Sequence, residues 1–210
     1  MNARAVSRSS RPSRGGSVRR RRRAVALLVI AALVGLGVAL VAPYFNRAVR
    51  EVTLPLRHED IIRQQAEDKK LDPALIAGVI FAESKFRDAT SPTGAKGLMQ
   101  IQPATARYIA DKSGGTRFEL RDLGTPQINI SYGSFYLRYL MDRYGDNEVL
   151  AVAAYNGGET NVDRWIVESG QRGQAFTKAE IPFPETRAYV DRVLHARDDY
   201  RRRYRDELGL

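Results

Sequence analysis

The chain of 210 residues contains no cysteine. This absence excludes disulfide bonds, thiolate metal sites, a cysteine nucleophile and a lipid-modified cysteine. Histidine is scarce as well, since only His58 and His195 occur, and neither has the spacing of a metal-ligand pair. We therefore predict no metal site and no cofactor, and we interpret both histidines as ordinary satisfied or exposed side chains.

Acidic residues are missing from residues 1–23, which hold nine arginines, five of them consecutive. Those nine account for most of the net charge of +10, because the other 25 basic residues face 24 acidic ones. A basic protein can bind nucleic acid, but here the charge belongs to a terminal tail and not to the rest of the chain. We therefore expect no nucleic-acid partner.

Residues 24–42 have no polar side chain. As a helix, nineteen residues extend about 28 Å, close to the thickness of the hydrocarbon core of a bilayer. A cleaved signal peptide is the alternative, but its apolar region is usually only about 7–15 residues long. We favour a single transmembrane anchor. Positive charge beside a span stays cytoplasmic, so residues 1–23 are predicted to be a cytoplasmic tail that contacts anionic lipid head groups.

The remaining chain is predicted to lie outside the cytoplasmic membrane, with residues 43–56 as a juxtamembrane spacer and residues 57–210 as one domain. Its apolar residues recur with a helical period, which predicts an all-α, mainly helical fold. Only the glycine-containing stretch near residues 91–101 leaves room for a small β-hairpin. The predicted helices cover residues 58–71, 73–86, 126–144 and 147–156, and others start at Pro103 and Pro184.

Glu83 is the most unusual acid of the domain. On a helix that begins at Pro73, it shares one face with three apolar residues, Ile76, Val79 and Ile80. Burial and a nearby helix C-terminus both disfavour the carboxylate and raise its pKa, as a general acid requires. Two interpretations are open from periodicity alone: a proton-holding acid in an apolar setting, or a frayed helix end that points Glu83 into solvent.

The loop "TSPTGAKGLMQ" follows at residues 90–100. It lacks the Gly-x-x-x-x-Gly-Lys-Ser/Thr pattern of a phosphate-binding loop. Its proline and glycines instead predict a rigid turn, which would bring Ser91 and Gln100 near the acid. Taken alone, residues of these two types are more often ordinary parts of a turn or a core.

Two later segments carry further candidates. "AAYNGG", residues 153–158, ends an apolar helix with Tyr155 and Asn156 before two glycines. The double glycine is also a common helix terminator. "PETRAYV", residues 184–190, places Tyr189 on the apolar side of the last helix. A tyrosine packed in a core is the alternative interpretation there.

The ordered set of Glu83-Ser84, Gly97-Leu98-Met99-Gln100, Ala154-Tyr155-Asn156-Gly157-Gly158 and Tyr189 resembles the soluble-lytic-transglycosylase family over about residues 60–200. Each motif alone is weak, but the set in this order is specific. The resemblance implies a lysozyme-like helical domain with Glu83 as the catalytic acid. It also implies glycan-binding roles for Ser91, Gln100, Tyr155, Asn156 and Tyr189. One departure is Gln102, where many members have methionine.

The implied activity is non-hydrolytic cleavage of the bond between N-acetylmuramic acid and N-acetylglucosamine in peptidoglycan, which leaves 1,6-anhydro ends. Only Glu83 stands in a motif, whereas ordinary glycosidases use two carboxylates. The predicted partners are glycan strands and, through residues 24–42, the cytoplasmic membrane. Two alternatives stay open: a lysozyme-like hydrolase, and a non-catalytic glycan-binding or assembly scaffold.

Overall fold

The computed structural model describes residues 25, 27–28, 33–42, 44–45, 49, 51–114, 117–171 and 176–210. The chain forms two compact units, residues 1–50 and residues 51–210. In the described part of the first unit, residues 33–42 are helical and their large apolar side chains are exposed. Among the described residues, none of the helices has both the length and the apolarity needed to span a bilayer. The predicted tail, residues 1–23, lies outside the described residues, as does part of the predicted anchor.

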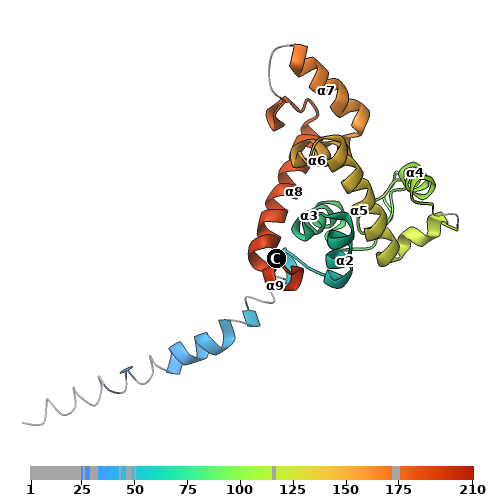
Figure 1. The fold of residues 1–210 in the computed structure, drawn as a ribbon. Helices are drawn as coiled ribbons and strands as arrows, with labels where there is room; N and C mark the ends of the chain where they lie inside the picture. Colours follow the sequence, from blue (N-terminus) through green and yellow to red (C-terminus); the bar gives the residue numbers. More distant parts are fainter. Residues whose placement is uncertain are drawn as a thin grey trace, which may run out of the picture. The chain divides into compact units, whose positions relative to one another are not determined.

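The second unit is helical (Figure 1). Its longer helices match the predicted ones in place and type, but the sequence analysis assigned no helix to α7. No β-strand occurs in the part of the chain that the structure describes. The elements in chain order are α2 (Glu59–Lys69), α3 (Pro73–Ser84), α4 (Pro103–Ser113), the short 3₁₀-helix η1 (Leu120–Gly124), α5 (Pro126–Arg143), α6 (Glu148–Gly157), α7 (Glu159–Gln171), the 3₁₀-helix η2 (Lys178–Glu180), α8 (Pro184–Arg203) and α9 (Arg205–Leu208).

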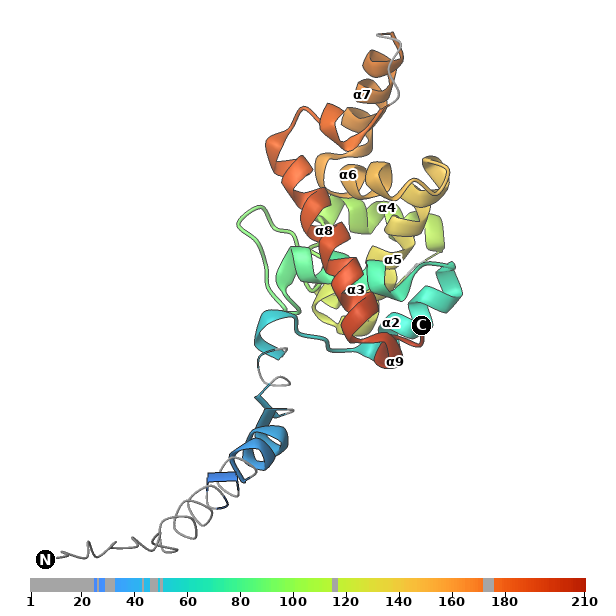
Figure 2. The ribbon, with the colours of Figure 1, turned by 90° about the vertical axis from the view of Figure 1, so that its left-hand side faces the viewer.

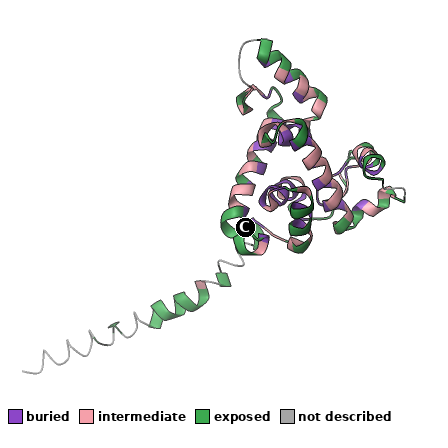
Figure 3. Ribbon diagram, viewed as in Figure 1, coloured by how far each residue is buried: buried purple, intermediate pink, exposed green. Residues whose placement is uncertain are grey.

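Helix α3 is the centre of the core, because almost every residue from Ala74 to Ile80 is fully buried. Asp72 caps its start by accepting a hydrogen bond from the Ala74 amide at 2.9 Å, and Pro73 occupies the first helical position. Buried residues dominate α3 and the facing sides of its neighbours (Figure 3). A helix that is apolar on all sides can only be stable when other helices enclose it.

Helix α8 runs alongside α3 (Figures 1 and 2). The two backbones approach closely at Gly78, where an added Cβ would lie 2.8 Å from the Val193 carbonyl oxygen. Only glycine permits this approach without displacing a backbone. The close contact fixes how the ends of the two helices face one another, which matters for the site described below.

Helix α3 ends abruptly after Ser84. Lys85 and Phe86 both have left-handed backbone conformations, with φ of 52° and 60°, which costs free energy for residues other than glycine. The buried Phe86 ring packs against Tyr200 of α8, with ring centroids 6.0 Å apart. Burial of this ring offsets the backbone cost and turns the chain sharply away from the helix end.

The loop of residues 88–101 then folds back over the core. Two isolated antiparallel bridges, Thr90 with Lys96 and Lys96 with Ile101, are its only sheet-like pairings. The hairpin for which the sequence left room therefore does not form as a pair of strands. The loop is too short and too tightly turned for a continuous ladder, with φ of 76° at Gly97 and 47° at Gln100.

Helix α7 is attached to the rest of the unit by Trp165. This side chain is 2% exposed, and its ring meets Phe183 edge-on at a centroid distance of 5.0 Å. The indole also contacts Gly157, where an added Cβ would lie 3.4 Å from the ring and, more tightly, 3.1 Å from the Thr186 hydroxyl. Val162, Trp165 and Ser169 form the buried stripe of α7, a helical spacing that was readable in the sequence.

Candidate functional site

Glu83 and Tyr189 meet where α3 and α8 lie side by side. The Tyr189 hydroxyl donates a hydrogen bond to Oε1 of Glu83 at 2.6 Å. Glu83 is half-buried at the end of α3, and Tyr189 is 2% exposed. The frayed-end interpretation of Glu83 is therefore wrong, because the side chain is held by a residue 106 positions away.

The pKa of the Glu83 carboxyl group is raised from its ordinary value of 4.5 to about 7. Burial is the main cause, since it disfavours the charged form. The hydrogen bond from Tyr189 and the positive charge of Arg192 both lower the pKa, but less than burial raises it. Arg192 lies over the Tyr189 ring, 5.7 Å from its centroid. Glu83 therefore retains a proton on a substantial fraction of molecules near pH 7.

Tyr155 borders the same carboxyl group. Its pKa is raised well above 10, first by burial and then by the charge of Glu83, so the phenol stays neutral. Its hydroxyl donates to the Met99 carbonyl at 2.9 Å, which ties α6 to the loop of residues 88–101. The structure thus brings together Glu83 of α3, Tyr155 of α6 and Tyr189 of α8, which are distant in sequence.

Asn156 follows at the end of α6 and is exposed. Its Oδ1 accepts a hydrogen bond from the Thr186 hydroxyl at 2.8 Å. Thr186 is buried in the first turn of α8, three residues before Tyr189. The contact orients the amide of an exposed side chain.

Ser91 and Gln100 stabilise the loop itself. The Ser91 hydroxyl accepts from the Ala95 amide at 3.0 Å and is 2.9 Å from the Thr93 hydroxyl. The Gln100 amide nitrogen donates to the carbonyls of Ala89 and Gly97, at 2.9 and 2.8 Å. Their predicted contacts with a glycan stay predictions. Gln102 is also bound within the loop, donating to the Thr93 hydroxyl at 3.2 Å.

Two residues that the sequence analysis gave no role hold this loop in place. The buried Ser84 hydroxyl lies 2.7 Å from the Leu98 carbonyl, to which it donates, and so joins the residue next to Glu83 to the loop. Asn129 of α5 is 1% exposed and binds three backbone groups, those of Lys96, Met99 and Leu123. The position of Ser84 next to Glu83 could have suggested a role for Ser84 at the site. No sequence pattern indicates that Asn129 contacts residues 96 and 99.

Across the ranges that the structure describes, no three histidine, cysteine, aspartate or glutamate side chains gather as they would around a metal ion. The groups that the structure brings together are one carboxyl group with a pKa of about 7, a phenol bonded to it, and a second phenol beside it. Such a carboxyl group can both give and accept a proton at neutral pH.

Comparison with known proteins places the chain in a family. Residues 60–176, more than half of the chain, match the family described as the transglycosylase SLT domain. The chain belongs to the transglycosylase SLT family. Among relatives in this family, the soluble lytic murein transglycosylase of Salmonella typhimurium is 36% identical over 162 residues, which cover 73% of this chain and 24% of the relative.

Membrane-bound and structurally known relatives share the domain. The membrane-bound lytic murein transglycosylase F of Alcanivorax borkumensis is 32% identical over 154 residues, covering 68% of this chain and 31% of the relative. The structure of an inactive Glu-to-Gln mutant of the lytic transglycosylase Slt from Pseudomonas aeruginosa superposes with a TM-score of 0.67 at 30% identity, covering 74% of this chain and 26% of that chain. This chain thus spans a quarter to a third of the length of these SLT-family proteins.

Proposed function

We propose that this SLT-family chain is a lytic transglycosylase that cuts the β-1,4 bond between N-acetylmuramic acid and N-acetylglucosamine in peptidoglycan. The observation that carries the proposal is the Glu83 carboxyl group with a pKa of about 7, bonded to Tyr189. The lytic transglycosylase names of the Salmonella and Alcanivorax relatives support the reaction. The inactive Glu-to-Gln mutant of the Pseudomonas relative agrees with a catalytic glutamate.

In the first step, the protonated Glu83 donates its proton to the glycosidic oxygen, and the bond from that oxygen to the anomeric carbon breaks. The carbonyl oxygen of the muramic N-acetyl group attacks the anomeric carbon, forming a bicyclic oxazolinium ion. Besides burial, the groups that shift the pKa of Glu83 are Tyr189 and Arg192, and neither carries a carboxyl group. Ordinary glycosidases place a second carboxyl group about 5–10 Å from the acid. The arrangement around Glu83 fits a nucleophile that the substrate itself supplies.

In the second step, Glu83, now ionised, accepts the proton of the muramic 6-hydroxyl group. The 6-oxygen attacks the anomeric carbon, the bond to the N-acetyl oxygen breaks, and a 1,6-anhydro ring closes. Glu83 ends the cycle protonated, and no water is consumed. Because one group acts as acid and then as base, a pKa near the working pH serves both steps. Tyr189 holds the carboxyl group, and Ser91, Gln100, Tyr155 and Asn156 are proposed to position the sugar.

The products of purified peptidoglycan test this function. We expect mass spectrometry to find muropeptides ending in 1,6-anhydro-muramic acid, lighter by one water than the products of a hydrolase. Reducing muramic ends in place of anhydro ends would instead establish the lysozyme-like alternative. Glycan binding with no released fragments, at protein concentrations equal to those of the substrate, would establish the scaffold alternative.

We further propose that residues 24–42 anchor the protein in the cytoplasmic membrane, with the tail of residues 1–23 inside the cell and the domain outside. The uncharged run of nineteen residues beside five consecutive arginines supports this topology. The full chain is expected to sediment with membranes and to resist extraction by carbonate. A variant lacking residues 2–42 should be released. Recovery of the intact chain in the soluble fraction would contradict the anchor.

A further inference from the structure

Arg192 is an exposed residue of α8 that lies outside the motifs of the sequence analysis. It follows Tyr189 by three positions, so the two side chains are neighbours on the helix surface. Long side chains on a helix lean toward its N-terminus, and the guanidinium group of Arg192 lies over the Tyr189 ring, 5.7 Å from the ring centroid. A cation at this distance is attracted to the negative face of the ring. The contact joins an exposed positive charge to the buried phenol that holds Glu83.

The charge of Arg192 is not cancelled by a bound acid. Within the described ranges, no carboxylate forms an ion pair with its guanidinium group. The adjacent Asp191 pairs with Lys178. Asp199 lines the same pocket of about 340 Å³ as Arg192 but pairs with Arg202 at 2.8 Å. The positive charge of Arg192 is therefore available to the phenol and the carboxyl group beside it.

This charge acts on both members of the hydrogen-bonded pair. Burial raises the pKa of Glu83, whereas the Tyr189 hydrogen bond and the charge of Arg192 lower it. Burial also raises the pKa of the Tyr189 phenol well above 10 and the charge of Glu83 raises it further, but Arg192 lowers it. A more acidic phenol is a stronger donor, and hydrogen bonds to an ionised acceptor are the strong ones. Arg192 thus favours the state in which Glu83 has given up its proton.

The proposed reaction passes through that state. After the first step, Glu83 is a half-buried anion beside the phenols of Tyr155 and Tyr189. A buried anion without a positive partner is costly. Among the described residues, Arg192 is the one positive charge that shifts the pKa of this carboxyl group.

We propose that Arg192 is a positioning residue that acts through the Tyr189 ring to stabilise ionised Glu83 and so sets the upper pH limit of the activity. The inference rests on the proposed function for the two steps that Glu83 performs. It gives a role to an exposed residue that touches neither the carboxyl group nor the bond that is cut.

The dependence of kcat/KM on pH tests this role in Arg192→Gln, which removes the charge. Glu83 must start the reaction protonated, so wild-type activity should fall as the pH rises through about 7. In Arg192→Gln this fall should occur at a higher pH, because the carboxyl group holds its proton more strongly. At pH 5 the variant should be about two- to fivefold slower, since its acid is weaker, a factor equivalent to an exposed cation–aromatic contact. The difference should narrow as the pH rises.

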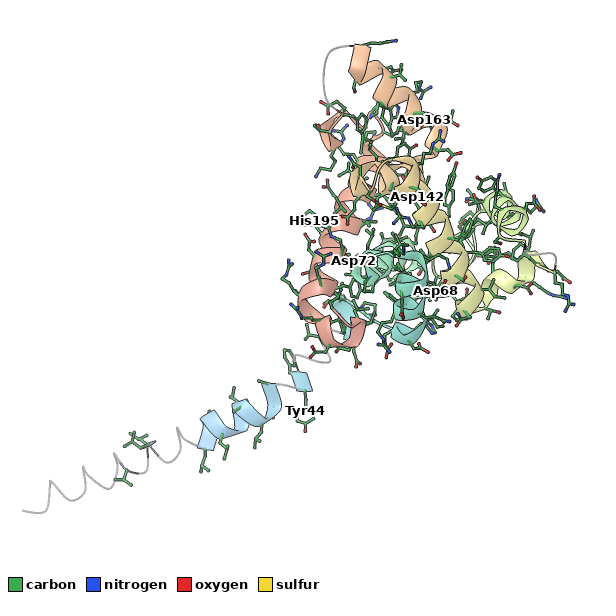
Figure 4. The ribbon with its side chains drawn as sticks, viewed as in Figure 1. Tyr44, Asp68, Asp72, Asp142, Asp163 and His195 are labelled. Carbon is green, nitrogen blue, oxygen red and sulfur yellow. The ribbon has the colours of Figure 1, made fainter. Side chains whose placement is uncertain are left out.

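Three variants serve as controls. Arg192→Lys keeps a positive charge and should restore the wild-type profile. Arg202→Gln removes the same charge farther along α8, and His195→Gln removes the imidazole that lines the same pocket and is marked on α8 in Figure 4. Both should keep the wild-type profile. Equal slowing by Arg192→Gln at every pH would indicate a structural role and overturn the proposal. An equal shift in Arg202→Gln would assign the effect to net charge and overturn it as well.

A titration without substrate separates this proposal from the proposed function. The full-length chain, in detergent micelles, is labelled with ¹³C at the glutamate side-chain carboxyl carbons, and the signal that Glu83→Gln lacks is assigned to Glu83. We expect this signal to titrate at a higher pH in Arg192→Gln than in wild type, whether or not the protein cuts peptidoglycan. An unchanged titration would refute the role of Arg192 even if cleavage is found. A shifted titration in a protein that cuts no peptidoglycan would support the coupling and refute the proposed function.

Discussion

Replacing Glu83 by glutamine should lower the rate of strand cleavage about 10²- to 10⁴-fold, the usual contribution of a general acid–base group. Glutamine keeps the shape of the side chain and can still accept the hydrogen bond from Tyr189, but it cannot donate a proton to the glycosidic oxygen. The rate of release of anhydro-muropeptides from purified peptidoglycan measures the effect. Glu67→Gln, an exposed acid on α2, is the control and should retain wild-type activity.

The stability of Glu83→Gln can be predicted as well, and measuring it checks that the variant is folded. The pKa of Glu83 is higher in the folded protein, about 7, than its ordinary value of 4.5, so folding favours the protonated form. Its contribution to stability is fully present below pH 4.5 and is lost as the pH rises through 7. Glu83→Gln lacks this loss, so at pH 8 it should be more stable than wild type, by about 3 kcal/mol. A variant that is less stable than wild type at pH 8 would contradict the raised pKa of Glu83.

Replacing Asn129 by alanine should lower the free energy of unfolding by about 2–4 kcal/mol. The Asn129 amide donates to the Lys96 and Leu123 carbonyls, both at 2.9 Å, and its Oδ1 accepts from the Met99 amide at 2.8 Å. Alanine removes all three bonds and opens a void; the Lys96 carbonyl keeps its bond from the Ile101 amide, but the Met99 amide and the Leu123 carbonyl lose their Asn129 partner in a buried setting. Urea denaturation followed by far-ultraviolet circular dichroism measures the loss.

Asn129→Ala should also lower the activity, because the Met99 carbonyl accepts a hydrogen bond from the Tyr155 hydroxyl. A loosened loop would release Tyr155 beside Glu83 and lower kcat. The matched control is Asn161→Ala on α7, where the amide donates to the Gly157 carbonyl and accepts from the Arg164 guanidinium group in an exposed hydrogen bond; we expect a loss of about 1 kcal/mol or less. If Asn129→Ala were no more destabilising than Asn161→Ala, the loop would not depend on this amide.

Local sequence patterns predict the helices of this domain well. A proline at the start of a helix and the spacing of its apolar residues both depend only on residues within that helix. Pro73, Pro103, Pro126 and Pro184 each open a helix. The overlooked α7 has such a spacing too, in Val162 and Trp165, but it follows two glycines that suggest a loop. The hairpin near residues 91–101 does not form as strands, because the tight turns of this loop limit the pairing to two isolated bridges.

The site shows where sequence reasoning stops. The apolar setting of Glu83 follows from helical spacing, but its bond to Tyr189 depends on the α3–α8 approach at Gly78. The structure places Tyr155 beside that acid, while the glycan-binding roles that the order of motifs gives to Tyr155 and Asn156 stay predictions. The role of Asn129 depends on contacts across 30 or more positions, and no local rule predicts these.

Trp165 is the single tryptophan of the chain, so the tryptophan fluorescence of the protein comes from one known position. Because its indole is enclosed between Gly157 and Phe183, its emission reports on the attachment of α7 and not on the α3 core. A shift in tryptophan fluorescence before the loss of helical signal would therefore reveal that α7 detaches first.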